Sequence, residues 1–104
     1  MSQELRLETI LAVSSRVYSR DLVDEVVLLD FGRGEYYGLD EAGALLWKTA
    51  EAKGTIGDAV TAIVARFDAD RARVEADILA LAKELVSEGL VEVVGARSSG
   101  ETSA

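Results

Sequence analysis

The sequence predicts an α+β domain, in which an N-terminal three-stranded antiparallel sheet that includes a β-hairpin is followed by three helices. Two short runs rich in β-branched, aromatic and aliphatic residues, at 26–31 and 35–39, flank a glycine-containing connection and indicate the hairpin. Three stretches with apolar residues at helical spacing follow along the chain. This order of elements is related to that of winged helices.

The segment before the hairpin gives a weaker strand signal. Residues 5–13 alternate between apolar and mostly polar positions, which predicts one strand. Residues 14–25 are polar and charged, with Val17 and Leu22 as isolated apolar positions. We therefore expect a loop at 14–25, with at most a short extended piece.

The hairpin connection is predicted to contain three residues, 32–34. Gly34 occupies the last loop position, where a positive φ favours glycine. Phe31 then pairs with Glu35, and side chains alternate between the two faces of the sheet. The residues turned toward the core are Val27, Leu29, Tyr37 and Leu39. The residues turned to the opposite face are Val26, Leu28 and Tyr36. This second apolar face needs a cover, from the N-terminal strand, another subunit or a ligand.

The first two helices begin at recognisable caps. Asp40 precedes a helix over about 41–52, which contains the only Trp and is expected to end at Gly54. We expect Leu46 and Trp47 in this helix to be core residues. Thr55 begins the second helix, and Asp58 three residues later completes a capping box.

The third helix is the longest. It is predicted to begin at Asp70 or Arg71, to run to Glu88 and to stop at Gly89. Its apolar stripe contains Val74, Ile78, Leu81, Ala82, Leu85 and Val86. Its outward residues are Asp77, Ala80, Lys83, Glu84 and Glu88.

The end of the chain divides into two parts. Leu90, Val91 and Val93 form a short apolar segment, which we expect to pack back on the body of the domain. The composition of residues 96–104 is typical of a frayed end. We therefore predict a single domain at 1–95 and a flexible tail at 96–104.

Composition excludes several kinds of chemistry. The chain has no His and no Cys, so it cannot form a Ser-His-Asp or Cys-His triad, a disulfide or a usual zinc site. Its 19 Asp and Glu residues are spread along the chain, as on a solvated surface. We therefore predict no catalytic residues, no metal site and no cofactor.

Charge and hydropathy narrow the range of partners. The net charge of −8 opposes binding to a phosphate backbone, and the cationic residues are scattered. No apolar run approaches the roughly 20 residues that span a bilayer, and the N-terminus lacks the order of a signal peptide. We expect a cytoplasmic protein without nucleic-acid or membrane partners.

Several motifs resemble those of the PqqD-like family. They are Leu-Leu-Asp at 28–30, Gly-Glu-Tyr-Tyr-Gly-Leu-Asp at 34–40 and Leu-Trp at 46–47. Members of the family typically carry Asn where this chain has Asp40, and Asp preserves the capping role. The order and spacing of the motifs follow the family pattern over about residues 16–94.

The resemblance implies a recognition element for ribosomally made, post-translationally modified peptides. Such a domain binds the leader segment of a precursor peptide and delivers it to a separate processing enzyme. The chain is most similar to the leader-binding proteins of lasso-peptide pathways, where that enzyme is a leader-cleaving protease. The peptide chaperone of pyrroloquinoline quinone synthesis, which serves a radical-SAM enzyme, is the alternative.

The resemblance also implies that the peptide lies along the second hairpin strand and against the third helix. An exposed strand edge can accept an extended peptide as a further strand. The predicted peptide-binding residues are Glu35, Tyr36, Tyr37, Gly38, Leu39, Val74, Asp77, Ile78, Ala80, Leu81 and Glu84. Ile78 and Leu81 are equally compatible with the core. Of Tyr36 and Tyr37, we expect one in the core and one near the peptide.

Two hypotheses from other classes remain open. In the first, the apolar sheet face forms a homodimer, and the domain has an assembly role without a peptide ligand. In the second, the chain is a degenerate winged-helix regulator. Residues 70–89 hold five acids against three bases, so this helix is poorly suited to enter the major groove of DNA.

Overall fold

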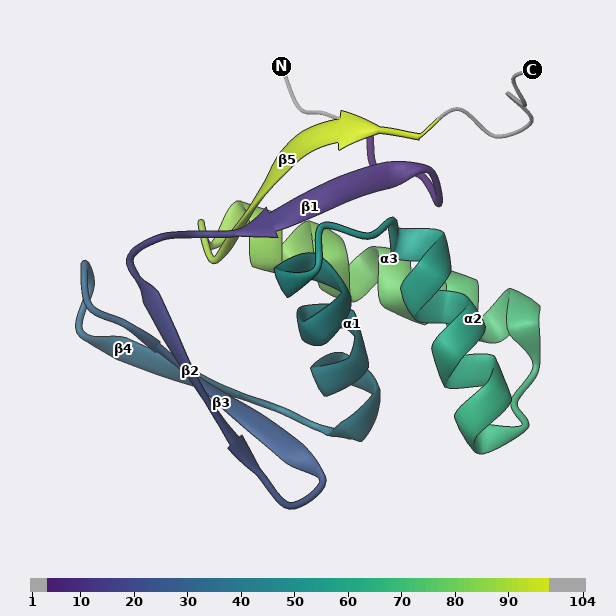
Figure 1. Cartoon of the computed structure of the whole chain (residues 1–104), viewed down its shortest axis with the longest axis horizontal. Coiled ribbons are helices and arrows are strands. Elements are labelled where there is room, and N and C mark those ends of the chain that lie inside the picture. The colour runs from purple at the N-terminus through teal and green to yellow at the C-terminus, as the bar shows by residue number, and fades with distance from the viewer. Residues whose placement is uncertain (1–3, 98–104) are drawn as a thin grey trace.

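The computed structural model describes residues 4–97 of the 104-residue chain. The elements, in order, are β1 (Thr9–Val13), β2 (Val17–Leu22), β3 (Glu25–Asp30), β4 (Glu35–Leu39), α1 (Glu41–Glu51), α2 (Ile56–Phe67), α3 (Arg71–Ser87) and β5 (Val91–Ala96). They form two antiparallel sheets, β2-β3-β4 and β1-β5. Figure 1 shows β1 and β5 above the helices, and the three-stranded sheet extending to the lower left. The α+β class is confirmed.

The three-stranded sheet is present, but its third strand is not the one expected. Residues 17–22, predicted as a loop, form β2, and the N-terminal strand pairs instead with β5. Most residues of β2 are exposed, so the strand lacks the apolar alternation by which half-buried strands are recognised in a sequence. The apolar segment after α3 packs on the body as expected, and it does so as strand β5.

The hairpin loop contains four residues, not three. Asp30 pairs with Glu35, which is one residue earlier than predicted. The Asp30 carboxylate accepts a hydrogen bond from the N–H of Gly32 at 2.9 Å. The backbone carbonyl oxygen of Asp30 accepts one from the N–H of Gly34 at 2.8 Å. These bonds close the loop around Asp30 and leave Phe31 outside the ladder. Gly34 has φ of +67°, as predicted for the last loop position.

This shift of one residue exchanges the two faces of the hairpin. Leu28 pairs with Tyr37 and Val26 pairs with Leu39, and these four residues lie on the face toward the helices. The prediction that Val27 and Leu29 face the core is therefore wrong. Those two residues share the outer face with Tyr36.

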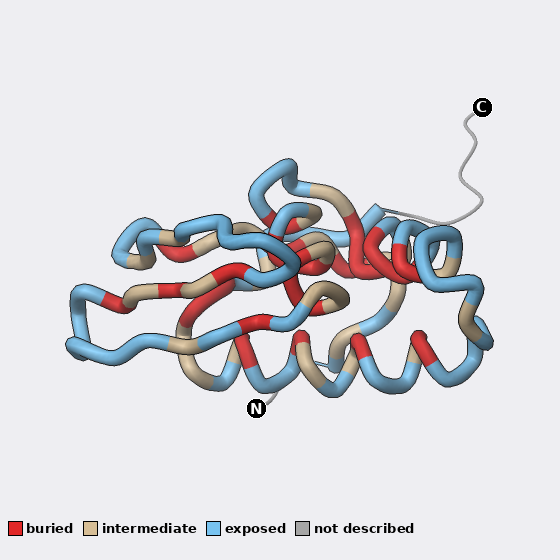
Figure 2. Tube along the Cα trace, turned by 90° about the horizontal axis from the view of Figure 1, so that it is seen from below, coloured by how far each residue is buried: buried red, intermediate tan, exposed pale blue. Residues whose placement is uncertain are grey.

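The core lies between the sheets and the helices. Leu46 and Trp47 are each 1% exposed, which confirms them as core residues, and Leu11 and Leu90 join them from β1 and the end of α3. Figure 2 shows the buried positions recurring along α3, as expected for a helix with one face toward the core. Among the described residues, no helix is long and apolar enough to cross a membrane.

The helix caps follow the sequence closely. Asp40 accepts the N–H of Gly43 at 2.9 Å, and Thr55 and Asp58 form the reciprocal capping box. The expected end of α1 at Gly54 needs a correction, because Lys53 is the residue that takes the left-handed conformation, with φ of 60°. The N–H of Gly54 still contributes to this end by donating to the carbonyl of Thr49 at 2.9 Å.

The first and last described segments of the chain lie side by side at β1. The N–H of Arg97, just after β5, donates to the carbonyl of Glu8 at 2.9 Å. The remaining residues of the expected tail, 98–104, lie outside the described residues. The single-domain boundary at residue 95 stays a prediction.

An ion pair between the buried Asp30 and the exposed Arg16 joins the hairpin loop to the segment before β2. The side chain of Asp30 is 1% exposed and accepts hydrogen bonds from Arg16, from Nε at 2.9 Å and from Nη2 at 3.3 Å. A Cβ added at Gly89 would lie 2.6 Å from Nη2 of Arg16, so the guanidinium also sits against the end of α3. The hydrogen bond from Arg16 lowers the pKa of Asp30 below its usual 3.8, although burial acts in the opposite direction.

We predict that Asp30→Asn lowers the urea midpoint of unfolding at pH 7. Because the folded-state pKa of Asp30 is lowered, the ionised carboxylate stabilises the fold above about pH 3.8, and this contribution is lost as the pH falls through the folded-state value. The difference between the two proteins should therefore narrow below pH 3.8. Asp21→Asn is the control, because it removes an exposed ion pair with Lys48. It should lower the free energy of unfolding by less than about 1 kcal/mol. An Asp30→Asn protein as stable as the wild type at pH 7 would contradict this role.

Candidate functional site

Strand β4 is an edge of the three-stranded sheet, and a side-chain hydrogen bond from its Tyr37 connects it to Glu88 at the end of α3. The strand order β2-β3-β4 leaves one side of β4 without a partner among the described strands. Figure 2 shows α3 along the lower edge of the view, with β4 beside it. Because hydrogen-bonding groups alternate along a strand, every second residue of β4 turns its N–H and C=O toward this open side.

At one end of this space, side chains connect the start of β4 to the last turn of α3. Tyr37 donates its hydroxyl hydrogen to Glu88 Oε1 at 2.8 Å. Arg33 Nη1 donates to the carbonyl oxygen of Glu88 at 3.0 Å and to its Oε1 at 3.2 Å. The hydrogen bond to the Glu88 carboxylate raises the pKa of Tyr37, with further contributions from burial and from the negative charges of Glu88 and Glu35.

At the other end, the first turn of α1 lies between β4 and α3. A Cβ added at Gly43 would lie 3.2 Å from Cβ of Leu39 and 3.3 Å from Cδ2 of Leu81. Leu39 and Leu81 therefore both pack against this glycine. We use the name edge groove for the strip of surface between the open edge of β4 and the exposed flank of α3, which ends at Gly43.

The predicted residues on β4 differ in how they face this groove. Glu35, Tyr36 and Gly38 are exposed, Tyr37 is half-buried and Leu39 is buried. Tyr37 contacts α3 through Glu88, whereas Tyr36 is 72% exposed on the outer face of the sheet. Of the two tyrosines, Tyr37 is thus the one on the side of the groove, and neither is fully buried.

The predicted residues on α3 also divide into two groups. Val74 and Ile78 are buried in the core. Leu81 is half-buried, and the remaining three, Asp77, Ala80 and Glu84, are exposed. Of the predicted α3 residues, this second group is therefore the one that stays accessible to a ligand.

Three residues at the edge groove were not among the predicted peptide-binding residues. They are Arg33, Gly43 and Glu88. Glu88 lies two turns after Leu81, so helical spacing alone could have placed both on one flank. Arg33 lies in the hairpin loop and gave no comparable signal. Gly43 becomes informative only through its close contacts with two other elements.

The outer face of the sheet forms a second, apolar surface. Tyr18, Arg20, Val27, Leu29 and Tyr36 line an open hollow of about 330 Å³. Phe31 is 68% exposed and extends this surface, with its ring centroid 6.5 Å from that of Tyr18. No described residue covers this surface, and the N-terminal strand, one of the expected covers, lies in the other sheet.

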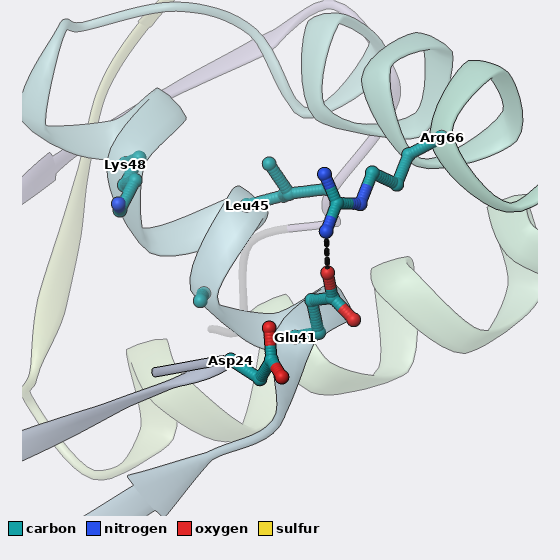
Figure 3. A pocket seen from close by; sticks show the side chains of 6 residues that line it. Asp24, Glu41, Leu45, Lys48 and Arg66 are labelled. Carbon is teal, nitrogen blue, oxygen red and sulfur yellow. Dashed lines mark hydrogen bonds and ion pairs between the residues drawn. The ribbon is translucent and has the colours of Figure 1, made fainter. Parts of the chain in front are cut away.

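A smaller hollow of about 190 Å³ lies between α1, α2 and the β2–β3 turn. Figure 3 shows Asp24, Glu41, Lys48 and Arg66 around it, and an ion pair between Arg66 and Glu41. Lys48 pairs with Asp21 at 3.2 Å. Because both cations already have carboxylate partners, this hollow offers no free charge for an anion.

No group of metal-ligating side chains occurs within residues 4–97. The candidate surfaces are the open edge of β4, the exposed flank of α3 and the apolar outer face of the sheet.

Comparison with known proteins identifies the family. Residues 25–91 match the model for coenzyme PQQ synthesis protein D (PqqD), and they include all of β3, β4 and the three helices. The chain belongs to the PqqD family. The resemblance inferred from the sequence motifs is thereby confirmed.

Two solved structures are similar to this PqqD-family chain. TbiB1 in complex with the TbiA(beta) leader peptide is 34% identical, with a TM-score of 0.73, and the match covers 81% of this chain and 98% of TbiB1. Lasso peptide synthetase B1 complexed with the leader peptide is 23% identical, with a TM-score of 0.69, and the match covers 78% of this chain and 95% of that protein. A search of curated proteins finds no match.

Proposed function

We propose that this PqqD-family chain binds the leader segment of a ribosomally made precursor peptide as an added strand on β4. The observation that carries the proposal is the open edge of β4, which faces the exposed flank of α3 across the half-buried Leu81. The likeness to TbiB1, which was solved in complex with a leader peptide, supports the same ligand class.

The two walls of the edge groove have different roles in this proposal. The backbone of residues 35–39 supplies hydrogen bonds that are independent of the leader's side chains. Leu81, which is half-buried and packs against Gly43 as Leu39 does, provides an apolar contact for one leader side chain. Binding therefore combines a general preference for extended peptides with a local preference for an apolar residue.

The bound leader is then delivered to a separate processing enzyme, and the chain itself performs no chemistry on the peptide. The absence of His and Cys supports this division of roles. We favour the leader-cleaving protease of a lasso-peptide pathway as the enzyme, on the motif resemblance. A PQQ-type peptide chaperone serving a radical-SAM enzyme is the second candidate: the motif resemblance implies it as the alternative, and the matching family model is that of coenzyme PQQ synthesis protein D. The cytoplasmic location stays a prediction.

The outer face of the sheet is the surface that we assign to the processing enzyme. It carries exposed Tyr18, Phe31 and Tyr36 around a central Leu29, and large exposed apolar patches commonly mark protein interfaces. It lies on the same sheet as β4 but does not include the open edge, so both partners can bind at once. A homodimer through this face is the competing assignment.

The first test of the proposal is Gly38→Pro, which should abolish leader binding. Proline removes one N–H from the edge strand and restricts Tyr37 before it. Gly38→Ala is the matched control, because a Cβ at this position meets nothing within 4 Å and the N–H is retained. Affinity for a fluorescent leader of the co-encoded precursor can be measured by anisotropy. Wild-type affinity in a folded Gly38→Pro protein would place the peptide elsewhere.

The second test concerns the helix side of the groove. Leu81→Asp places a carboxylate where an apolar leader side chain is expected, and its desolvation is unfavourable. Leader affinity should fall at least about tenfold, or roughly 1.4 kcal/mol. Leu79→Asp, at another half-buried position on a different face of α3, should leave leader affinity unchanged in the folded protein. Full affinity in folded Leu81→Asp would refute this contact.

The third test separates delivery from binding. The double variant Tyr18→Ser/Leu29→Ser should keep leader affinity within about twofold but slow leader cleavage by the co-encoded protease at least about tenfold, because it removes apolar area only from the outer face. Cleavage is followed by mass spectrometry, and precursor incubated with this chain alone should stay intact. Normal cleavage by the double variant would exclude this face as the docking surface. If the wild-type protein is a dimer and the double variant is a monomer, the homodimer through this face is favoured instead.

A further inference from the structure

The two ends of α3 differ in their charge balance. Near the start of α3, two acids each have a cation one turn away: Arg71 pairs with the half-buried Glu75 at 3.0 Å, and Arg73 lies 4.0 Å from the exposed Asp77. Near the end of α3 the balance changes, because Glu84 and Glu88 follow one another on the groove flank and the last turn contains no basic residue. The C-terminal end of the groove is therefore the more negative one.

The cations around this end do not neutralise it. Arg33 serves two carboxylates, lying 3.2 Å from Glu88 and 3.9 Å from Glu35. Arg16 is occupied by the buried Asp30. Lys83 lies about 200° around the helix from Leu81, at the usual 100° per residue, and so points away from the groove. At this end, two arginines are therefore shared by four carboxylates, which belong to Asp30, Glu35, Glu84 and Glu88.

The helix itself adds to the negative potential. The C-terminal end of a helix carries partial negative charge from its unpaired carbonyl groups, so acids are unfavourable there and cations are favourable. Glu84 and Glu88 are thus placed at the end where their own charge is least stabilised. The raised pKa of Tyr37 reflects the same excess of carboxylates. Its largest cause is the hydrogen bond to Glu88, and the charges of Glu88 and Glu35 also oppose ionisation of Tyr37.

We propose that the leader binds with a lysine or arginine side chain at this end of the groove, next to Glu35 and Glu84, and with an apolar side chain over Leu81. This inference rests on the proposed binding of a leader strand at β4 and specifies the chemistry of that strand. The cation would meet the two carboxylates that Arg33 leaves least compensated. It would also lie at the negative end of the α3 dipole.

The geometry of the groove sets the spacing of these two leader residues. Glu84 and Glu88 lie about 4.5 Å and 10 Å beyond Leu81 along the helix axis, at 1.5 Å per residue. A strand advances about 3.3 Å per residue, and alternate side chains share a side. A basic residue two positions from the apolar one therefore fits both requirements.

The test is a selection of random twelve-residue peptides, displayed on their own messenger RNA, against the immobilised full chain. On the wild type, we expect Lys or Arg two positions from an apolar residue to be enriched at least about threefold over the library. Glu35→Gln/Glu84→Gln should lose this enrichment. Glu4→Gln/Glu25→Gln removes the same net charge at exposed residues outside the groove and should retain it.

Affinity measurements complete the test. The best basic peptide should bind Glu35→Gln/Glu84→Gln about tenfold more weakly than the wild type, and replacing its basic residue by Gln should remove that difference. Equal enrichment of basic residues on all three baits would overturn the charge assignment. The charge assignment would also be overturned if the selected peptides were apolar, showed no preference for Lys or Arg and failed to bind Gly38→Pro. That result would leave the proposal of leader binding at β4 standing. Peptides that bind Gly38→Pro as well as the wild type would overturn the proposed function itself.

Discussion

The Asp30 carboxylate is the group on which the arrangement of the sheet depends. It accepts backbone N–H groups from the hairpin loop, and it is held by Arg16 from the segment before β2. The loop therefore closes at Asp30, and the register of β4 on β3 follows from that closure. Arg16 also rests against Gly89, so the same ion pair connects the hairpin to the end of α3. A buried carboxylate with several hydrogen-bond donors is costly to disrupt, which makes it an effective fixed point for the register.

The register determines how one small sheet presents three different surfaces. The face that carries Val26, Leu28 and Leu39 is buried against the helices. The opposite face, with Leu29 at its centre, stays open and apolar. The edge of β4 faces α3 and offers backbone groups in place of side chains. In the proposed function, the first surface stabilises the domain, the second docks the processing enzyme and the third holds the leader.

The edge groove owes its shape to contacts at both of its ends. Tyr37 and Arg33 join β4 to Glu88, and Gly43 lets Leu39 and Leu81 approach each other at the start of α1. Both sets of contacts hold the strand edge at a fixed place relative to the helix before any peptide arrives. A groove that is already formed loses less conformational entropy on binding. In the proposal, its uneven charge then adds a preference for the direction and composition of the peptide.

The sequence by itself determined the features that depend on near neighbours in the chain. The three helices, the caps at Asp40 and Thr55 and the positive φ of Gly34 could all be predicted, because each rests on residues within a few positions of one another. The motif order also led to the PqqD family, and the spacing of α3 placed Leu81 beside exposed acids. Only the tertiary structure decided which strands pair and which sheet face is buried. Strand β2 has too few buried residues to show in a sequence pattern, β1 and β5 come from opposite ends of the chain, and one hydrogen-bonded carboxylate moved the hairpin register by a residue.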